Sequence, residues 1–390
     1  MSTPSSGSGA GRLAVTIAVV QFFFATTWTL YVIYLPQLAA QAGIGKEWIP
    51  WILVADQVVF AVTDVVTGFW VDRVRRSMAR FGPWILVVTV VSAAAFLALP
   101  FAGGSAALLL AAVFVWAVTS SALRSPPWAL LSQHAAKPSL PWLSAVVLAG
   151  SALAAAAAPY LGIALKDVDP RLPFLLSTLT LVATVSALVL AEKGFKAEKA
   201  PEAARSPRPS SFPFFAALLL MGIGFQVHFA LNSAPQYLRV ASAPELPYLM
   251  PVFWIGFNLA MLPAGGLVKR LGDLQAMSLA AAAGALAVLA TTVAGGLASL
   301  VTAQLAAGAC WGMASVAAYT AAVGYGRTGR EGRYLGLLFA MLALAAFARI
   351  AAYASDLVMA DPVKALLPWI PQAAWLAAAL ILCARFFRRA

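Results

Sequence analysis

Five ionisable side chains lie inside long apolar segments, where they could carry charge or protons through a membrane. They are Asp56, Asp64, Arg124, His228 and Arg349. An ionised side chain in hydrocarbon costs at least about 2.5–3.5 kcal/mol by insertion scales, so such a group faces a cavity or a partner. Two kinds of chemistry suit this set: binding of a charged or hydrogen-bonding solute, and reversible protonation of a carboxylate that is linked to a change of conformation.

The segments that carry these residues are membrane helices by composition. Of the 390 residues, 62% are hydrophobic and 10% are charged, whereas a soluble domain has roughly 25% charged residues. The net charge of +12 falls in short gaps between apolar runs and not along one face, which excludes nucleic acid as a partner. Each run is close to the roughly 20 residues that a spanning helix needs. Twelve spans are predicted, at 13–35, 49–71, 84–101, 106–131, 142–164, 172–191, 212–237, 247–268, 274–295, 298–325, 334–358 and 365–386.

The basic residues predict how the chain crosses the bilayer. Of the 26 Lys and Arg residues, 19 fall on the side that also holds both termini, five fall on the other side, and two lie inside spans. This bias places both termini in the cytoplasm. We therefore expect an all-α, multi-pass protein of the plasma or inner membrane that is a monomer in the lipid bilayer. Its predicted parts are a tail, a six-helix bundle, a polar linker, a second six-helix bundle and a tail: 1–12, 13–191, 192–211, 212–386 and 387–390.

Helix depth brings two of the five ionisable residues to one level. At about 1.5 Å per residue, Asp64 lies about 22 Å and Arg124 about 27 Å below the outer ends of their helices. We expect the two to be close and to face a cavity. Two interpretations stay open: a permanent ion pair that fixes helix packing, and a pair that protonation of Asp64 releases. Asp56 is only about 10 Å deep. Two interpretations stay open for it: entry of a proton, and a carboxylate that is simply solvated by water.

The second half offers candidates for binding a solute. Arg349 lies near mid-membrane and is expected to bind an anionic or hydroxyl-rich group, unless it pairs with Asp56 or Asp64. His228 lies close to Gln226 in the sequence. Two roles stay open for His228: a hydrogen-bonded packing residue, and a proton relay.

Aromatic and amide side chains at similar depth indicate a polar-lined pocket, because rings with polar edges can stack on a flat ligand. They are Gln21, Trp28, Tyr31, Trp116, Trp128, Trp254, Asn258, Gln304, Trp311, Tyr319 and Tyr353. The predicted substrate contacts are Arg349, His228, Gln226, Asn232, Trp128, Tyr353 and Asn258.

A short motif occurs once in each half. Gly68-x-x-x-Asp72-Arg73 leaves the second span, and Gly265-x-x-x-Lys269-Arg270 leaves the eighth, an offset of 197 positions. The two copies are separated by about half the chain, each leaves the second helix of its half, and both lie on the same side of the membrane. This agreement indicates an internal repeat. The motif and the topology resemble the major facilitator superfamily over nearly the whole chain. The resemblance implies two pseudo-symmetric six-helix bundles, alternating access, and a gate on the cytoplasmic side. The expected gate residues are Gly68, Asp72, Arg73, Arg76, Gly265 and Arg270.

A narrower resemblance is to the melibiose-permease-like sugar–cation symporters. Asp64 followed by Gly68, the run Arg80-Phe-Gly-Pro-Trp84 and the run Arg124-Ser-Pro-Pro-Trp128 carry it. In that family the position of Asp64 is a cation ligand. Two further sodium-site carboxylates are replaced here by Phe60 and Arg124, so the resemblance does not imply a sodium site.

These observations predict a secondary transporter that moves a small polar or anionic solute, sugar-like or an organic acid, by proton-coupled symport. Asp64, Arg124 and Asp56 are the predicted coupling residues. The first alternative is a proton-driven exporter of drugs or amphipathic compounds, and the second is a non-transporting receptor or scaffold. The sequence contains no nucleophile–base set and no metal-ligand set, so we expect no enzyme activity, cofactor or metal site. Cys310 and Cys383 are expected to be buried thiols.

Overall fold

The computed structural model describes residues 6–77, 82–135, 137–194, 210–326 and 329–387. Within these ranges the regular structure is helical, and no strand is found. Eleven helices are long and apolar enough to cross a membrane, and a further apolar helix, Ile370–Ala384, is shorter. The predicted all-α membrane fold is confirmed.

The helices follow the predicted spans in order. The first half contains α1 (Ser6–Gln41), α2 (Ile49–Ser77), α3 (Gly82–Ala98), α4 (Ala106–Ala122), α5 (Pro126–His134), α6 (Leu140–Ala164) and α7 (Arg171–Gly194). The second half contains α8 (Phe212–Val227), α9 (Ser233–Tyr237), α10 (Leu246–Leu249), α11 (Pro251–Leu271), α12 (Asp273–Val293), α13 (Leu297–Gly326), α14 (Glu331–Ala354), α15 (Asp361–Leu366) and α16 (Ile370–Phe387). Most of the predicted linker, 195–209, lies outside the described residues, so the domain boundaries stay predictions.

Two of the predicted spans are interrupted at an ionisable residue. The span 106–131 is divided into α4 and α5, because Pro126 and Pro127 lack an N–H group and fit the first turn of a new helix. Arg124 lies in this break. The span 212–237 contains a π-helical turn, His228–Asn232, between α8 and α9. Such turns are frequent at functional sites.

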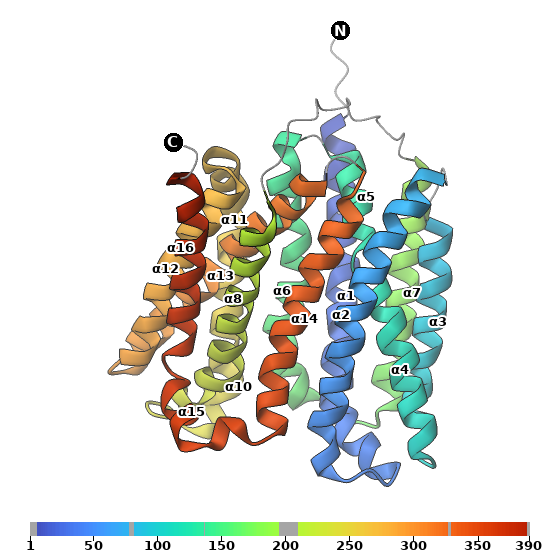
Figure 1. The fold of residues 1–390 in the computed structure, drawn as a ribbon. Coiled ribbons are helices and arrows are strands. Elements are labelled where there is room, and N and C mark those ends of the chain that lie inside the picture. The colour runs from blue at the N-terminus through green and yellow to red at the C-terminus, as the bar shows by residue number, and fades with distance from the viewer. Residues whose placement is uncertain (1–5, 78–81, 136, 195–209, 327–328, 388–390) are drawn as a thin grey trace.

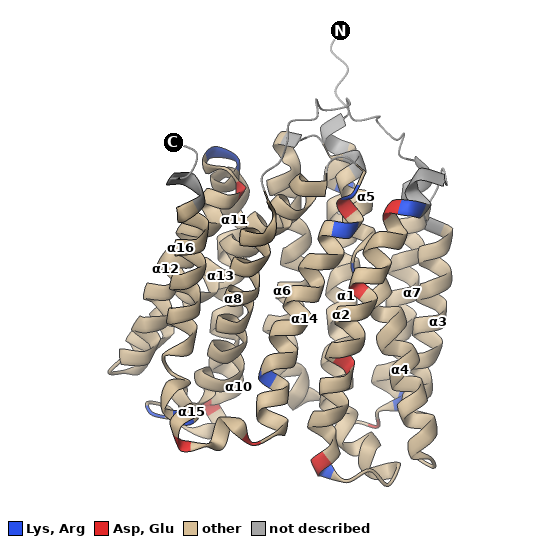
Figure 2. Cartoon of the chain, viewed as in Figure 1, with Lys and Arg blue, Asp and Glu red and all other residues tan. Residues whose placement is uncertain are grey.

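The two halves stand side by side and meet along two pairs of helices (Figure 1). α2 lies against α14, and α6 lies against α11. The first turn of α1 and the last turn of α16 are at the same end of the molecule, at the top in Figure 1, which we call the terminal side. Charged residues gather toward the two ends of the helices, and few lie at mid-length (Figure 2). This distribution suits a protein whose middle lies in hydrocarbon.

Glycines allow α2 and α14 to cross at short range. A Cβ atom on Gly68 would lie 2.5 Å from the carbonyl oxygen of Gly332 and 3.1 Å from the Cα atom of Gly336. A Cβ atom on Gly336 would in turn overlap the carbonyl oxygen of Asp64. Small residues let helix backbones approach closely in lipid. The backbone around Asp64 is therefore held directly against the other half.

Candidate functional site

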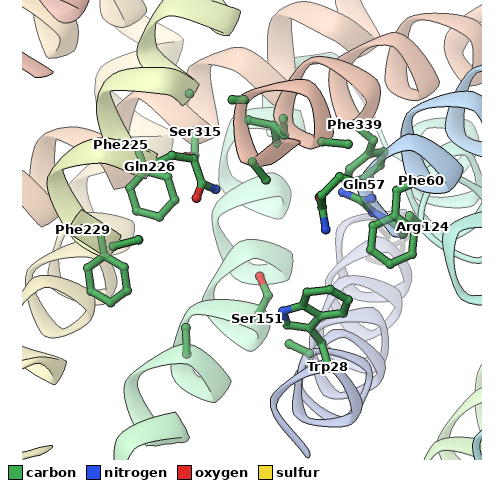
Figure 3. A pocket seen from close by; sticks show the side chains of 18 of the residues that line it. Trp28, Gln57, Phe60, Arg124, Ser151, Phe225, Gln226, Phe229, Ser315 and Phe339 are labelled. Carbon is green, nitrogen blue, oxygen red and sulfur yellow. The ribbon is translucent and has the colours of Figure 1, made fainter. Parts of the chain in front are cut away.

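A cavity of about 560 Å³ lies between the two halves. Its wall comes from α1, α2, α4 and α6 on one side and from α8, α11, α13 and α14 on the other. In Figure 3, Arg124 and Phe60 lie on one side of the cavity, and Gln226 and Phe225 on the other. Within the described residues, the charged side chains of the lining are Arg124 and Arg349, and no carboxylate lines the cavity. A concave site with this charge attracts anions.

Arg124 forms an ion pair with Asp64. Arg124 Nη1 donates to Asp64 Oδ2 at 3.0 Å, and Ser121 Oγ donates to Asp64 Oδ1 at 2.8 Å. The side chain of Asp64 has no exposed surface, whereas 21% of the Arg124 side chain is exposed. The contact expected from helix depth is confirmed. Asp64 itself is not among the described residues of the cavity lining, whereas its partner Arg124 is.

The same guanidinium group touches the second half. Arg124 Cζ lies 4.7 Å from the ring centroid of Phe339 on α14 and 5.6 Å from that of Phe60 on α2. A cation over an aromatic face is attracted to the ring. Arg124 therefore connects the carboxylate of Asp64 to both halves at once, and any change in the ion pair acts at the interface.

Arg349 has a neutral partner. Its Nε donates to Gln226 Oε1 at 2.9 Å, and both residues line the cavity from the second half. No carboxylate of the described chain lies within 4.0 Å of its nitrogen atoms, so the expected alternative of a pair with Asp56 or Asp64 is not observed. Its two Nη atoms make no hydrogen bond to the described residues, which leaves four N–H donors for a ligand.

Asp56 is separated from this site. Tyr31 Oη donates to Asp56 Oδ2 at 2.7 Å, and Asp56 lines a different cavity, of about 330 Å³, beside α2 and α4. The sequence groups Asp56 with Asp64 because their spacing of eight residues places both on one stripe of the same helix. The structure brings Asp64 together with Arg124 and leaves Asp56 at the other cavity.

His228 is buried inside the second half. Its Nε2 lies 3.0 Å from Gln304 Oε1, and Gln304 Nε2 donates to Ser233 Oγ and Gln236 Oε1, each at 3.2 Å. His228 has no exposed surface and is not among the described residues of the central lining. His228 belongs here to a hydrogen-bonded network inside the second half, and its role as a substrate contact stays a prediction.

Four further predicted substrate contacts also lie outside the described lining of the central cavity. Asn232 Nδ2 donates to the Leu367 carbonyl and Asn258 Nδ2 to the Trp254 carbonyl, each at 2.8 Å. Trp128 stacks on Tyr319 with ring centroids 4.2 Å apart, and Tyr353 is 52% exposed on the surface. Depth along a helix gives the level of a residue but not the direction of its side chain, which is why these four residues lie away from the cavity. Their roles as substrate contacts stay predictions.

Other residues of the predicted polar-lined pocket do line the cavity. They are Gln21, Trp28, Trp116, Trp254, Trp311 and Tyr319. The lining also contains residues that sequence reasoning missed: Gln57, Ser151, Phe225, Phe229 and Ser315. One signal was available for Gln57, because it precedes Phe60 by three and Asp64 by seven positions and so shares their helix face.

The first copy of the repeated motif joins the two halves on the terminal side. Asp72 Oδ1 accepts a hydrogen bond from Gly332 N at 2.7 Å, and Asp72 Oδ2 accepts one from Arg333 N at 2.9 Å. The carboxylate thus caps the N-terminus of α14, where the helix dipole favours negative charge. Arg73 is exposed, and the side chain of Arg76 lies outside the described part of the chain.

The second copy lies at the other contact between the halves. A Cβ atom on Gly265 of α11 would lie 2.7 Å from the Cα atom of Trp142 on α6. Lys269 stands at the position that corresponds to Asp72, so this copy has no carboxylate to cap a helix, and Arg270 is exposed. The two copies share close packing, and only the first adds a polar connection.

The described residues include no group of three or more His, Cys, Asp or Glu side chains that could hold a metal ion. Cys310 and Cys383 are free and half-buried.

Comparison with known proteins gives both a family and a fold. The family model of the Major Facilitator Superfamily matches residues 17–348. A search of curated proteins finds no match. Among solved structures, the human organic anion transporter MFSD10 (TETRAN) is 16% identical with a TM-score of 0.71, and the match covers 97% of this chain and 99% of that one. The Escherichia coli fucose:proton symporter FucP is 14% identical with a TM-score of 0.70, covering 96% and 98%. A bacterial homologue of the iron transporter ferroportin, in an outward-facing state, is 15% identical with a TM-score of 0.70, covering 95% and 98%.

Proposed function

Because the chain belongs to the Major Facilitator Superfamily and is a membrane transporter, we propose that it moves a small organic anion by proton-coupled symport through the central cavity. The observation that carries the proposal is the charge of the lining. Its described charged side chains are Arg124 and Arg349, and no described carboxylate lines the wall. An arginine presents a planar set of donors that matches a carboxylate, so an organic acid is the solute that fits best.

Binding begins at Arg349. Its Nη donors are not used by the described residues, and Gln226 fixes the guanidinium group through Nε. A carboxylate that enters the cavity can therefore form a two-point contact with Arg349 without displacing a charged partner. The rings of Phe225, Phe229 and Trp254 line the same side and favour a solute with an apolar or aromatic body.

Coupling takes place at the Asp64–Arg124 pair. An anion in the cavity competes with Asp64 for the guanidinium group of Arg124. A buried carboxylate that loses its counter-ion is unfavourable as an anion, so Asp64 takes up a proton when Arg124 turns to the substrate. One proton then accompanies one anion, and no net charge crosses the membrane for a monoanion. Asp56 has no part in this proposal, since it lies outside the central cavity.

Transport requires the two halves to open alternately. We place the terminal side in the cytoplasm on the basis of the Lys and Arg bias. Asp72 on the N-terminus of α14 and the glycine contact of α2 with α14 hold that side together. Phe339 connects Arg124 to α14, so release of Arg124 from Asp64 changes a contact of the helix that must move. In this scheme the anion and the proton enter from the outside and leave when the Asp72 contact opens.

The test uses purified protein in proteoliposomes. A thermal-shift panel of lactate, benzoate, succinate and neutral sugars first selects the solute that stabilises the protein, since a ligand of the native state raises its stability. Uptake of that solute is then measured with and without an inward proton gradient. The proposal predicts that a carboxylate is selected and that it accumulates only with the gradient. Selection of a neutral sugar, or equal accumulation without the gradient, would refute it.

Proton-driven export of amphipathic compounds is a second candidate, and the aromatic wall is the observation that favours it. Phe225 stacks on Trp311 with centroids 4.8 Å apart, and Phe229 lies 5.5 Å from Trp254. The direction of flux separates the two candidates. Export predicts that an outward-directed substrate flux follows inward proton movement, and that Arg349→Ala leaves this flux unchanged.

A further inference from the structure

A second cavity opens on the flank of the first half, away from the central one. It measures about 330 Å³ and is lined by residues of α2 and α4, among them Trp51, Ala55, Asp56, Leu110 and Phe114. Trp51, Leu110 and Phe114 are 45%, 43% and 58% exposed. Exposed apolar side chains on membrane-spanning helices contact lipid, so this cavity opens toward the bilayer and not toward the substrate path.

A carboxylate forms the polar end of this apolar cavity. Asp56 is 3% exposed, and its Oδ2 accepts the hydrogen bond from Tyr31. Oδ1 accepts no hydrogen bond from the described residues, and no described Lys, Arg or His lies within 4.0 Å of the carboxylate. A carboxylate at this depth without a counter-ion is unfavourable. One oxygen atom is thus free to bind a cation that comes from the cavity.

We propose that this flank cavity binds an organic ammonium ion with an apolar tail, which enters from the bilayer and places its ammonium group on Asp56. The chemistry of the wall selects this class. A metal ion requires several oxygen ligands, and the cavity offers one carboxylate among apolar side chains. An alkylammonium ion needs only that carboxylate, while tryptophan and phenylalanine rings attract its charge and pack on its tail. The volume lies within the range of small-molecule sites.

The side chain of Tyr31 links the flank cavity to the central cavity. Tyr31 donates to Asp56, and its ring lies 4.7 Å from Trp116 and 5.5 Å from Trp28, measured between centroids. Trp28 and Trp116 line the central cavity. An ammonium group bound at Oδ1 neutralises the carboxylate that accepts from the Tyr31 hydroxyl and so weakens that hydrogen bond. Occupancy of the flank cavity therefore acts on the wall of the substrate site. This inference does not depend on the identity of the transported solute.

The probe is 4-phenylbutylamine, with 4-phenylbutanol as a neutral control of the same shape. Binding to the purified full-length protein is measured by titration calorimetry. We expect saturable binding of the amine alone, and at least a tenfold weaker affinity for Asp56→Asn. Asp361→Asn, which changes an exposed acid of the second half, should bind as the unaltered protein does. Equal binding of amine and alcohol, or an unchanged affinity in Asp56→Asn, overturns the proposal.

A second pair of variants keeps the test decisive if Asp56→Asn does not fold. Ala55 is exposed and lines the flank cavity, so Ala55→Phe fills the cavity and leaves every charge in place. Val62 lies seven residues, or about two turns, further along α2. It is 58% exposed and lies outside both cavities, so Val62→Phe is the matched control. Ala55→Phe should lose amine binding, and Val62→Phe should retain it. If the two variants bind the amine equally, the site is not where we place it.

Discussion

The two arginines of the central cavity differ in what holds them. Arg124, in the first half, is paired with the buried carboxylate of Asp64. Arg349, in the second half, is held by the neutral amide of Gln226. An arginine that is paired with a carboxylate can exchange that carboxylate for one of a ligand. An arginine that is held by a neutral amide keeps its full charge for a ligand. In the function that we propose, this difference lets one cavity both attract an anion and respond to a proton.

Truncation of the two arginines should have unequal costs, and this is the largest effect we expect. Arg124→Ala leaves Asp64 buried without a counter-ion, and loss of one partner of a buried pair destabilises a protein by about 3–5 kcal/mol. Arg349→Ala leaves only a neutral amide, so stability should change little. The loss of charge-assisted hydrogen bonds should, however, weaken anion binding by about 10- to 100-fold. Thermal unfolding and ligand titration of both variants check this.

The double variant Asp64→Asn with Arg124→Gln is the control for that comparison. It removes both charges together, and it should recover most of the stability that Arg124→Ala loses. If the double variant is as unstable as Arg124→Ala, the ion pair is not what stabilises this part of the fold.

The close contact between α2 and α14 should be sensitive to a single side chain. Gly336 packs against the Asp64 carbonyl, and Gly336 and Arg349 lie on the same helix. Gly336→Val should destabilise the protein by about 1–3 kcal/mol through overpacking and should lower uptake. Gly266→Ala, where an added Cβ atom meets no neighbour within 4 Å, is the control in thermal unfolding. Unchanged stability of Gly336→Val would show that the helices are not held together there.

Gln226→Glu should make the second arginine resemble the first. A carboxylate at this position would pair with Arg349 and occupy the donors that we assign to the substrate. Anion affinity should fall by about 10-fold, since each 1.4 kcal/mol changes an equilibrium constant tenfold, and Gln226→Ala should have a smaller effect. Competition binding measures both. Equal affinity of Gln226→Glu and the unaltered protein contradicts the assignment of Arg349 as the anion site.

The smallest effect should come from the ring above Arg124. Phe339→Leu removes a cation–π contact worth about 0.5–2 kcal/mol and retains an apolar side chain of similar position. We expect a modest fall in thermal stability and slower uptake, with substrate affinity retained. Phe212→Leu, at a position that is 77% exposed and outside both cavities, should change neither stability nor uptake rate.

Sequence reasoning predicted those features that depend on helix length, depth and charge. The length of the apolar runs predicts twelve spans and a helical fold. The rise of an α-helix per residue places Asp64 and Arg124 at one level and so predicts their contact. Sequence reasoning did not predict the direction in which a side chain points. His228 and Trp128 lie at suitable depth, yet the π-helical turn at His228 and the break before α5 place them in packed interiors. The π-helical turn has no signal in the hydropathy, and the break before α5 is indicated by Pro126 and Pro127 and not by hydropathy.

The most direct test of the account is the number of protons that enter with each anion. Proteoliposomes that contain a pH-sensitive dye and a labelled form of the selected carboxylate report both fluxes in one experiment. For the unaltered protein we predict one proton for each monoanion. For Asp64→Asn we predict no coupled proton while exchange of the anion continues. Asp167→Asn, at an exposed position outside the cavity, should keep the original ratio. A ratio that Asp64→Asn leaves unchanged would contradict the assignment of the Asp64–Arg124 pair as the coupling site.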